Sequence, residues 1–377
     1  MKKKLITLLL FSTMVISLLT GCLSGKDKTT GGTGSPDTIP GTEASQNFDA
    51  DTPEETPVIR VACTPYSGHI LHAIAEEKGF YEDVGVQVEL YFTHYPVDAN
   101  AALLAGQVDV ASTYGTTVPL QSIADGSEFT IFGGYMLQGC MPVIGREGSE
   151  ISSVEDLIGK RVIGSPAAYY ISGPLMDLGY DPYNDIEWVQ SVDVTSNLEL
   201  VRKGEADYCP STTGLHTQAA EMGLIPACFA SDLLPEYSCC RVYSTTEWLN
   251  ENQDAAVCLM KAWMRAQEVL ETDKDFAVEV TVAQTELTKE YVEGFIKNDH
   301  FMIRLDPHWQ ATSRAWDYLD RLGVLGENTD IQNLKEHFTT DIYKAALDAA
   351  YEDYYDENPE YYDYYVAYFN EVNSDIL

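Results

Sequence analysis

The feature that most constrains the fold is a regular alternation of strand-like and helix-like segments that starts at Val58. Apolar residues alternate over 58–63, whereas over 69–78 they recur at helical spacing and stop at Gly79. The two patterns then repeat, with strands expected at 58–63, 86–92, 108–112 and 129–136 and helices at 69–78, 98–106 and 116–125. Strands that alternate with helices favour a parallel sheet with helices on its faces, so the predicted fold class is α/β.

The alternation begins again near Met141, which predicts a second lobe. Its expected elements are a helical turn at 154–159, strands at 161–164, 186–191 and 206–209, and helices at 169–178 and 196–203. From Thr246 onward helical patterns dominate, at 254–271, 273–284, 289–297, 308–322 and 340–351. We therefore expect a first lobe from 58–140 and 244–377, with C-terminal helices, and a second lobe from 141–243. The tyrosine-rich stretch 351–369 is expected to be a terminal helix whose rings lie on the body.

The first 22 residues indicate export and a lipid anchor. Three lysines precede an apolar run over 5–19, which is too short for a transmembrane helix, so 1–21 is predicted to be a signal peptide. The segment ends Leu-Thr-Gly-Cys and resembles the bacterial lipobox, which makes Cys22 the candidate lipidation site. Residues 22–57, rich in Gly, Thr, Ser and Pro, are expected to be a flexible spacer. We expect the protein on the extracellular face of the cell membrane, with the membrane as a partner through the lipid.

Charge and cysteine usage exclude several classes. The chain has 23 basic and 59 acidic residues, a net charge of −36, which excludes a nucleic-acid ligand because phosphate recognition needs clustered Lys and Arg. Seven cysteines remain besides Cys22, an odd number without a CxxC element. Cys239 and Cys240 are adjacent in the sequence and make a poor pair of metal ligands. We expect no metal site and no cofactor.

Five stretches of the chain together resemble one family of proteins. They are Ile59-Arg-Val-Ala with Pro65, the segment 75–90 around Lys-Gly-Phe-Tyr, 102–111, 151–162 and 200–207. Taken in order, they resemble the substrate-binding proteins of ABC importers for sulfonates, taurine, nitrate and thiamine-type pyrimidines, in the form of a Gram-positive lipoprotein. The resemblance implies a type II periplasmic-binding-protein fold, in which two lobes joined by two crossover segments close on a ligand. It also implies ABC permease subunits as partners.

Four loops qualify as parts of the ligand site. In open parallel sheets ligands bind beyond the carboxyl ends of the strands, where helix N-termini converge. Alternatives stay open: the first loop also fits an ordinary turn, His94 a plain loop, and 136–141 either a hinge or a cleft wall. The candidate ligand-binding residues are Thr64, Tyr66 and Ser67 in the first loop, His94 after the second strand, Tyr114, Gly115 and Thr116 in the second loop, Ser165, Tyr169 and Tyr170 in the third, and Ser211 and Thr212 in the fourth.

The third loop departs from the family pattern in a way that bears on the ligand. Family members carry a turn rich in Gly, Ser and Thr here, whereas this chain has Ala167-Ala168-Tyr169-Tyr170. This departure disfavours a small oxyanion and favours a ligand with a flat or apolar body that stacks on tyrosine.

The predicted function is capture of a small molecule and its delivery to an ABC importer permease by a monomeric protein. The ligand is expected to be a sulfonate, nitrate or a heteroaromatic of the pyrimidine type. An extracellular sensor that signals to a membrane receptor remains an alternative, because it would bind its ligand in the same way. A pyrimidine-synthase-like enzyme is a weaker alternative, because the CCCFC stretch of those relatives is absent here. We find no G-x-S-x-G or H-E-x-x-H motif and assign no catalytic residue.

Overall fold

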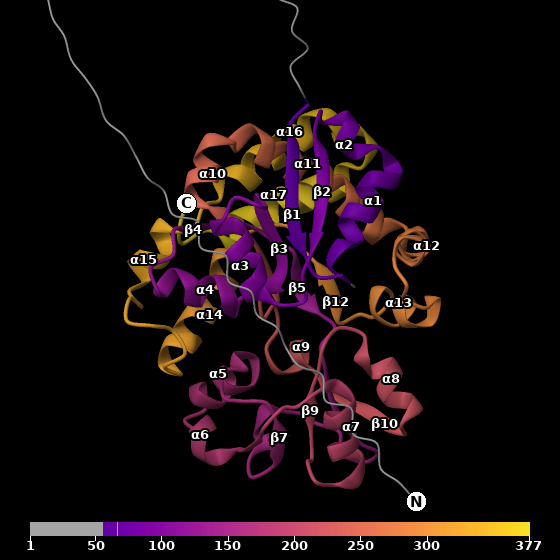
Figure 1. The fold of residues 1–377 in the computed structure, drawn as a ribbon, viewed down its shortest axis with the longest axis vertical. Coiled ribbons are helices and arrows are strands. Elements are labelled where there is room, and N and C mark those ends of the chain that lie inside the picture. Colours follow the sequence, from indigo (N-terminus) through magenta and orange to yellow (C-terminus); the bar gives the residue numbers. More distant parts are fainter. Residues whose placement is uncertain (1–55, 66) are drawn as a thin grey trace, which may run out of the picture. The chain divides into compact units, whose positions relative to one another are not determined.

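A five-stranded sheet with the order β2-β1-β3-β11-β4 forms the centre of the larger part of the fold (Figure 1). β1 pairs in parallel with both β2 and β3, which confirms the parallel sheet expected from the alternating pattern. β11 lies antiparallel between β3 and β4, so these two strands are not neighbours. The strands of this sheet are β1 (Val58–Cys63), β2 (Gln87–Phe92), β3 (Val110–Gly115), β4 (Phe129–Gly134) and β11 (Cys240–Thr245).

The computed structural model describes residues 56–65 and 67–377. The predicted signal peptide, Cys22, the spacer up to residue 55 and the candidate Tyr66 lie outside the described residues, and so does the side chain of Ser67. Within the described part, none of the helices combines the length and the apolar character that crossing a bilayer requires.

The predicted helices of the first segment are present with small shifts of their ends. The helix expected at 69–78 begins with a 3₁₀ turn at Ser67–His69 and ends before Gly79, as predicted. The strand expected over 129–136 is instead two strands, because the chain turns at Tyr135 and continues as β5 (Met136–Gly139). The helices here are α1 (Ile70–Lys78), α2 (Phe80–Asp83), α3 (Pro96–Leu104) and α4 (Thr117–Ala124).

Residues 142–229 carry a second group of strands. β10, β6 and β9 form an antiparallel sheet, β7 and β8 pair in parallel, and a bridge from Val162 to Tyr208 links β7 to the start of β9. β6 and β10 were not predicted, whereas β7, β8 and β9 were. The elements are β6 (Pro142–Arg146), β7 (Arg161–Ile163), α5 (Tyr169–Asp177), α6 (Pro182–Asp185), β8 (Glu187–Val189), α7 (Val194–Lys203), β9 (Cys209–Pro210), α8 (Leu215–Glu221), β10 (Leu224–Phe229) and α9 (Ala230–Leu233).

An arginine–aspartate pair occurs at the same place in both groups of strands. Arg60 on β1 donates from Nε and Nη2 to the carboxylate of Asp109, which also accepts the Arg60 backbone N–H. Arg161 on β7 makes the same three contacts with Asp207. Each aspartate follows a helix that ends in a glycine with positive φ, Gly106 at 64° and Gly204 at 74°. The repeat of helix, glycine and acidic residue in the sequence therefore produces one local structure twice.

The C-terminal region is helical apart from one short strand. β12 (Phe301–Ile303) pairs with β5, although only helices were expected here. The stretch 351–369, expected to be one terminal helix, is divided between the end of α16, a 3₁₀ turn at Tyr355–Glu357 and α17. The rings of α17 do lie on the body, since Tyr361, Tyr362, Tyr365 and Tyr368 are buried. In Figure 1, α11, α16 and α17 lie beside the five-stranded sheet. The helices are α10 (Thr246–Glu251), α11 (Gln253–Thr272), α12 (Lys274–Gln284), α13 (Lys289–Ile296), α14 (Trp309–Arg321), α15 (Ile331–Glu336), α16 (Asp341–Tyr354) and α17 (Pro359–Val372).

Candidate functional site

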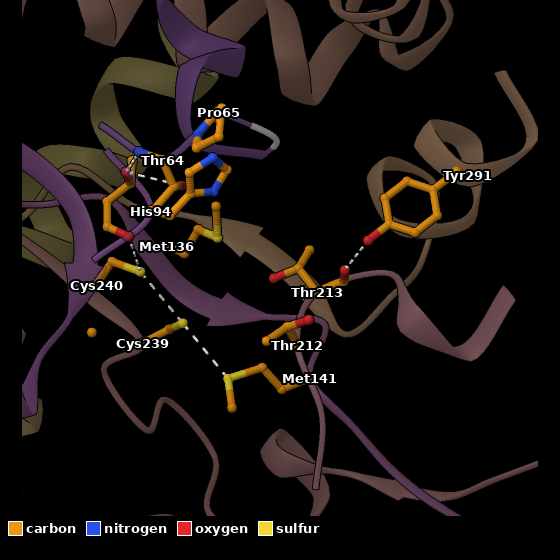
Figure 2. A pocket seen from close by; sticks show the side chains of 12 residues that line it. Thr64, Pro65, His94, Met136, Met141, Thr212, Thr213, Cys239, Cys240 and Tyr291 are labelled. Carbon is orange, nitrogen blue, oxygen red and sulfur yellow. Dashed lines mark hydrogen bonds between the residues drawn. The ribbon is translucent and has the colours of Figure 1, made fainter. Parts of the chain in front are cut away.

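A cavity of about 330 Å³ opens where the carboxyl ends of the three parallel strands converge (Figure 2). Its volume is at the lower end of the range for small-molecule sites. The lining comes from the loops after β1 and β2, from β3 and β5, from the residue before β6, from the loop after β9, from the start of β11 with the residue before it, and from α13. The lining residues are Thr64, Pro65, His94, Thr113, Gly115, Met136, Met141, Thr212, Thr213, Cys239, Cys240 and Tyr291.

Two threonines connect the loop after β1 to strand β3. The backbone N–H of Thr64 donates to Thr113 Oγ1 at 2.8 Å, and the two hydroxyl oxygens lie 3.2 Å apart. Gly68 packs directly on them, since a Cβ at this position would lie 2.5 Å from Thr64 Oγ1 and 2.9 Å from Thr113 Oγ1. Glycine is therefore needed at position 68 to keep the two hydroxyls at the cavity wall.

The fourth predicted loop is held in place from the C-terminal region. Thr213 donates from Oγ1 to the Gly139 carbonyl at 2.6 Å, and its own carbonyl accepts from the Tyr291 hydroxyl at 2.7 Å. Tyr291 lies on α13, 78 residues beyond Thr213. Three segments distant in the sequence thus meet at this edge of the cavity.

Sulfur atoms form the remaining wall, which we call the sulfur cluster: Met141, Cys239 and Cys240. Cys240 Sγ lies 3.5 Å from Cys239 Sγ, which in turn lies 3.9 Å from Met141 Sδ (Figure 2). The Cys240 thiol donates to Cys239 and thereby lowers the pKa of the Cys239 thiol. The same hydrogen bond, together with burial, raises the pKa of Cys240.

Among the residues that the structure describes, none of those that line the cavity is Asp, Glu, Lys or Arg. The nearest arginine in the sequence, Arg241, is fully buried and donates from Nη1 to the carbonyls of Asp306 and Pro307 at 3.5 and 3.0 Å. The cavity therefore offers hydroxyls, sulfur, an imidazole and a phenol ring, but no fixed charge of its own.

The structure brings four of the predicted residues together at the cavity: Thr64, His94, Gly115 and Thr212. The other described candidates lie outside the lining. Tyr114 is buried in β3 and donates to the Thr93 carbonyl at 3.5 Å, and buried Thr116 donates to the Ser238 carbonyl. Ser165 is exposed in the loop before α5, and the backbone N–H of Ser211 donates to the Pro142 carbonyl.

The two tyrosines expected to stack on the ligand pack instead against residues 237 and 238, which directly precede Cys239. Tyr169 donates to the carbonyls of Tyr237 and Ser238, the latter at 2.8 Å. The ring centroids of Tyr170 and Tyr237 are 5.6 Å apart. Both tyrosines are more than nine-tenths buried. A direct ligand contact for them stays a prediction, whereas their support of the segment 237–240 is visible in the structure.

Several lining residues were not among the predicted ones. Thr113 and Thr213 adjoin predicted residues, and the stretch 136–141 had been left open as a hinge or a cleft wall. Cys239 and Cys240 were judged from the sequence to be a poor metal-binding pair and were not considered for ligand contact, and Tyr291 carries no local signal. The unpredicted lining residues outside the predicted loops are Met136, Met141, Cys239, Cys240 and Tyr291. In the described part of the chain, no group of three His, Cys, Asp or Glu residues is placed to hold a metal ion.

Residues 67–275, more than half of the chain, match the family model described as NMT1/THI5 like. The chain belongs to this family. No significant match was found among curated protein sequences. The family assignment is in keeping with the resemblance stated from the sequence.

Solved structures show the fold of this NMT1/THI5-like protein. The periplasmic aliphatic sulphonate binding protein SsuA from Escherichia coli superposes with a TM-score of 0.61 at 14% identity, over 73% of this chain and 91% of that one. The periplasmic nitrate-binding protein NrtA from Synechocystis PCC 6803 superposes with a TM-score of 0.63 at 16% identity, over 78% and 89%. The predicted type II periplasmic-binding-protein fold is thereby confirmed.

The same fold also carries an enzyme. The desulfurization enzyme DszB superposes on this NMT1/THI5-like protein with a TM-score of 0.54 at 16% identity, over 78% of this chain and 99% of that one. Fold alone therefore does not separate binding from catalysis, and only the residues of the cavity can distinguish the two.

Proposed function

We propose that the protein is an extracellular, lipid-anchored solute-binding protein that captures a small uncharged molecule in the cavity and delivers it to an ABC importer permease. The observation that carries the proposal is the cavity at the carboxyl ends of β1, β2 and β3. It is lined by segments from both groups of strands, and the described residues of its lining include no Asp, Glu, Lys or Arg. The fold is shared with the periplasmic sulphonate- and nitrate-binding proteins, which supports a binding role. The leader sequence and Cys22 supply the export and the anchor.

Among the ligand classes expected from the sequence, the lining supports the heteroaromatic one. An anion loses its hydration on entering a cavity of this kind, and without a cationic partner that loss costs several kcal/mol. A neutral ring has no such penalty. Its polar edge can bond to the threonine hydroxyls, while its faces contact Met136, Met141 and Tyr291, where each sulfur–aromatic contact contributes about 0.3–1.5 kcal/mol.

We propose that binding closes a first lobe (58–140 and 244–377) on a second lobe (141–243). Thr64, His94 and Gly115 belong to the first, and Thr212 belongs to the second. A ligand that touches both sides binds the closed arrangement more tightly and shifts the population toward it. Residues 139–142 and 230–239 connect the two groups of strands and are the segments where such a movement would bend.

A ligand screen tests the proposal. The purified protein is heated with substituted pyrimidines, alkanesulfonates, taurine and nitrate, and hits are measured by calorimetry. We expect a rise in melting temperature with a pyrimidine-type compound and not with the anions. Stabilisation by a sulfonate or nitrate alone would contradict the neutral-ligand proposal.

A variant of Thr212 links the ligand to the cavity. Thr212 is exposed and lines the cavity, so Thr212→Val removes a hydroxyl at little cost to the fold. Loss of one hydrogen bond to the ligand is expected to weaken binding about threefold to tenfold. Thr195→Val, at an exposed threonine on α7, is the matched control and should bind like the unaltered protein.

A further inference from the structure

We infer that Glu236 and His308 form a pH-sensitive switch, which holds the connecting segment 235–239 against the C-terminal helices at neutral pH and releases it in acid. Glu236 lies in the connection between α9 and β11, and His308 directly precedes α14. The switch acts on this segment whether or not the cavity holds a ligand.

The backbone of this region is strained. In the part of the chain that the structure describes, four residues other than glycine have a positive φ: Cys140 at 48°, Glu236 at 50°, Ser238 at 63° and His308 at 56°. Cys140 belongs to the other connecting segment, 139–142, so all four lie in the two connections or in contact with them. A residue with a side chain keeps such a backbone only where surrounding contacts hold it there. We therefore expect the segment 235–239 to relax when its contacts are lost.

The contacts of the segment come from two C-terminal helices. Tyr368 on α17 donates from its hydroxyl to Glu236 Oε1 at 3.1 Å, and His308 Nε2 lies 3.3 Å from Glu236 Oε2. Arg314 on α14 donates from Nη2 to the carbonyls of Pro235 and Glu236, at 2.8 and 2.5 Å. The Glu236 side chain is therefore the point where both helices hold the segment.

The proton of His308 has only one place in this arrangement. The ring caps α14, because its Nδ1 accepts the backbone N–H of Ala311 at 3.1 Å. In a neutral imidazole one nitrogen accepts and the other carries the hydrogen, so Nε2–H donates to Glu236. A second proton, on Nδ1, would face the N–H of Ala311. The ring would have to turn to separate the two, and turning moves Nε2 away from Glu236.

The surroundings of His308 also oppose a second proton. The titratable and charged groups that face it are Glu236 from the connecting segment, Arg241 from β11, Asp306 from the loop before α14, Arg314 from α14 and Tyr368 from α17. Burial is the main cause that lowers the pKa of His308, and the positive charges of Arg241 and Arg314 lower it further. The Glu236 carboxylate acts in the opposite direction, but the pKa stays below its ordinary value. Burial raises the pKa of Asp306 to about 7, so in acid this residue offers the ring no compensating negative charge.

The sign of the effect follows from these directions. A released, solvated histidine has an ordinary pKa of about 6.5. Because the pKa of the held ring is lower, the neutral contact stabilises the held segment fully above about pH 6.5, and this contribution is lost as the pH falls below that value. Glu236 keeps its charge meanwhile, since the hydrogen bond from His308 lowers the pKa of its carboxyl group. Mild acid therefore acts through the histidine.

Release of the segment would reach the cavity wall. The hydroxyl of Tyr237 accepts the backbone N–H of Gly139 at 2.7 Å, which joins the two connecting segments to each other. The carbonyl of Cys239, a lining residue, accepts the backbone N–H of Thr116 at 2.9 Å. Loss of the Glu236 contact would thus loosen both connections and one wall of the cavity together.

The test is amide hydrogen exchange of the full-length protein without ligand at about pH 7.5 and about pH 5, with rates corrected for the intrinsic effect of pH. We expect protection of peptides that cover residues 231–240 to fall about tenfold at the lower pH, because a released ring with a pKa of about 6.5 takes up a proton there. Peptides from α7, which is not part of this region, serve as the internal reference. Equal protection of 231–240 at the two pH values would overturn the inference.

His308→Asn separates the titration from the cap. Asparagine is a favoured N-cap residue and tolerates the left-handed backbone, but its amide does not titrate. The variant also keeps Asp306, so any effect of that carboxyl group remains. We expect the pH dependence of 231–240 to disappear in His308→Asn and to persist in His337→Asn, which alters a histidine that contacts the Phe129 carbonyl instead. A pH dependence that is unchanged in His308→Asn would contradict the switch.

A second variant keeps the inference testable if His308→Asn folds poorly. Glu236→Gln leaves an acceptor in place but removes its charge, and hydrogen bonds to a charged group are roughly twice as strong as those between neutral groups. Protection of 231–240 at about pH 7.5 is therefore expected to fall about threefold to tenfold. Glu247→Gln, at an exposed position on α10, is the matched control and should not change it. Unaltered protection in Glu236→Gln would show that this carboxylate does not hold the segment.

Discussion

Asp207 illustrates how one residue ties local sequence to stability. Its carboxylate accepts the Nε, Nη2 and backbone N–H of Arg161, and Arg146 Nη2 lies 3.3 Å away. The hydrogen bond from the Arg161 side chain is the main cause that lowers the pKa of Asp207 to about 2. The unfolded chain has an aspartate pKa of about 3.9. The pair therefore stabilises the fold fully above about pH 4, and this contribution is lost as the pH falls through about 2.

We accordingly predict that Asp207→Asn lowers the melting temperature by a few degrees at pH 7. The difference from the unaltered protein should shrink below about pH 4 and be nearly gone at about pH 2. Melting curves recorded by circular dichroism between these pH values check the expectation, with Asp320→Asn at an exposed surface position as the control. A difference that stays constant down to pH 2 would show that charge pairing is not the cause.

Residue by residue, the site was predictable only where it lies at a strand end. Thr64, His94 and Gly115 follow β1, β2 and β3 or end them, so their convergence follows from parallel pairing alone. Tyr291 could not be found in this way, because its place depends on a hydrogen bond to Thr213 across 78 residues. Tyr169 and Tyr170 have the residue type of a stacking platform, but burial against Tyr237 decides where their rings lie.

Elements with a strong local signal were predicted well, and those defined by distant pairing were not. The helix α7 was expected because its apolar spacing and the following Gly204 are local features. β11 was missed, because its position between β3 and β4 depends on antiparallel pairing with residues more than 100 positions away. β12 has only three residues and pairs with β5, so its strand conformation depends on the partner.

The contribution of a single helix to the stability of the fold can be tested on the terminal helix α17. Tyr361 donates to the Met264 carbonyl, Tyr362 to Glu268 and Tyr365 to Glu271, so three successive inward rings bind one face of α11. Tyr362 is fully buried, and Tyr364 is 49% exposed.

We predict that Tyr362→Ala lowers the free energy of unfolding by about 3–5 kcal/mol, because it leaves a cavity between α17 and its neighbours. Tyr364→Ala, in the same helix, is expected to cost less than about 1 kcal/mol. Urea unfolding followed by tyrosine and tryptophan fluorescence measures both values. Similar losses in the two variants would mean that α17 contributes through helix formation and not through its packed face.

At the scale of the whole molecule, the cavity is a point where the two groups of strands meet. The first loop follows β1 and the fourth follows β9, and both contribute threonines to the lining. A ligand held by only one of these loops would leave the other free to move. A ligand that contacts both loops connects segments that are about 150 residues apart in the sequence. It can do so only when the two loops are close together, and it therefore stabilises the closed arrangement.

Hydrogen exchange measured by mass spectrometry distinguishes these cases. With a saturating compound from the ligand screen, we predict slower amide exchange in the peptides that cover residues 61–70 and 209–216 together, because both backbones become less mobile when the ligand bridges them. Peptides from α7, which lies outside the cavity, serve as the internal control. Protection confined to residues 61–70 would place the ligand on one side only and would argue against closure. Protection of both peptides that disappears from 209–216 alone in Thr212→Val would assign the bridging contact to that hydroxyl.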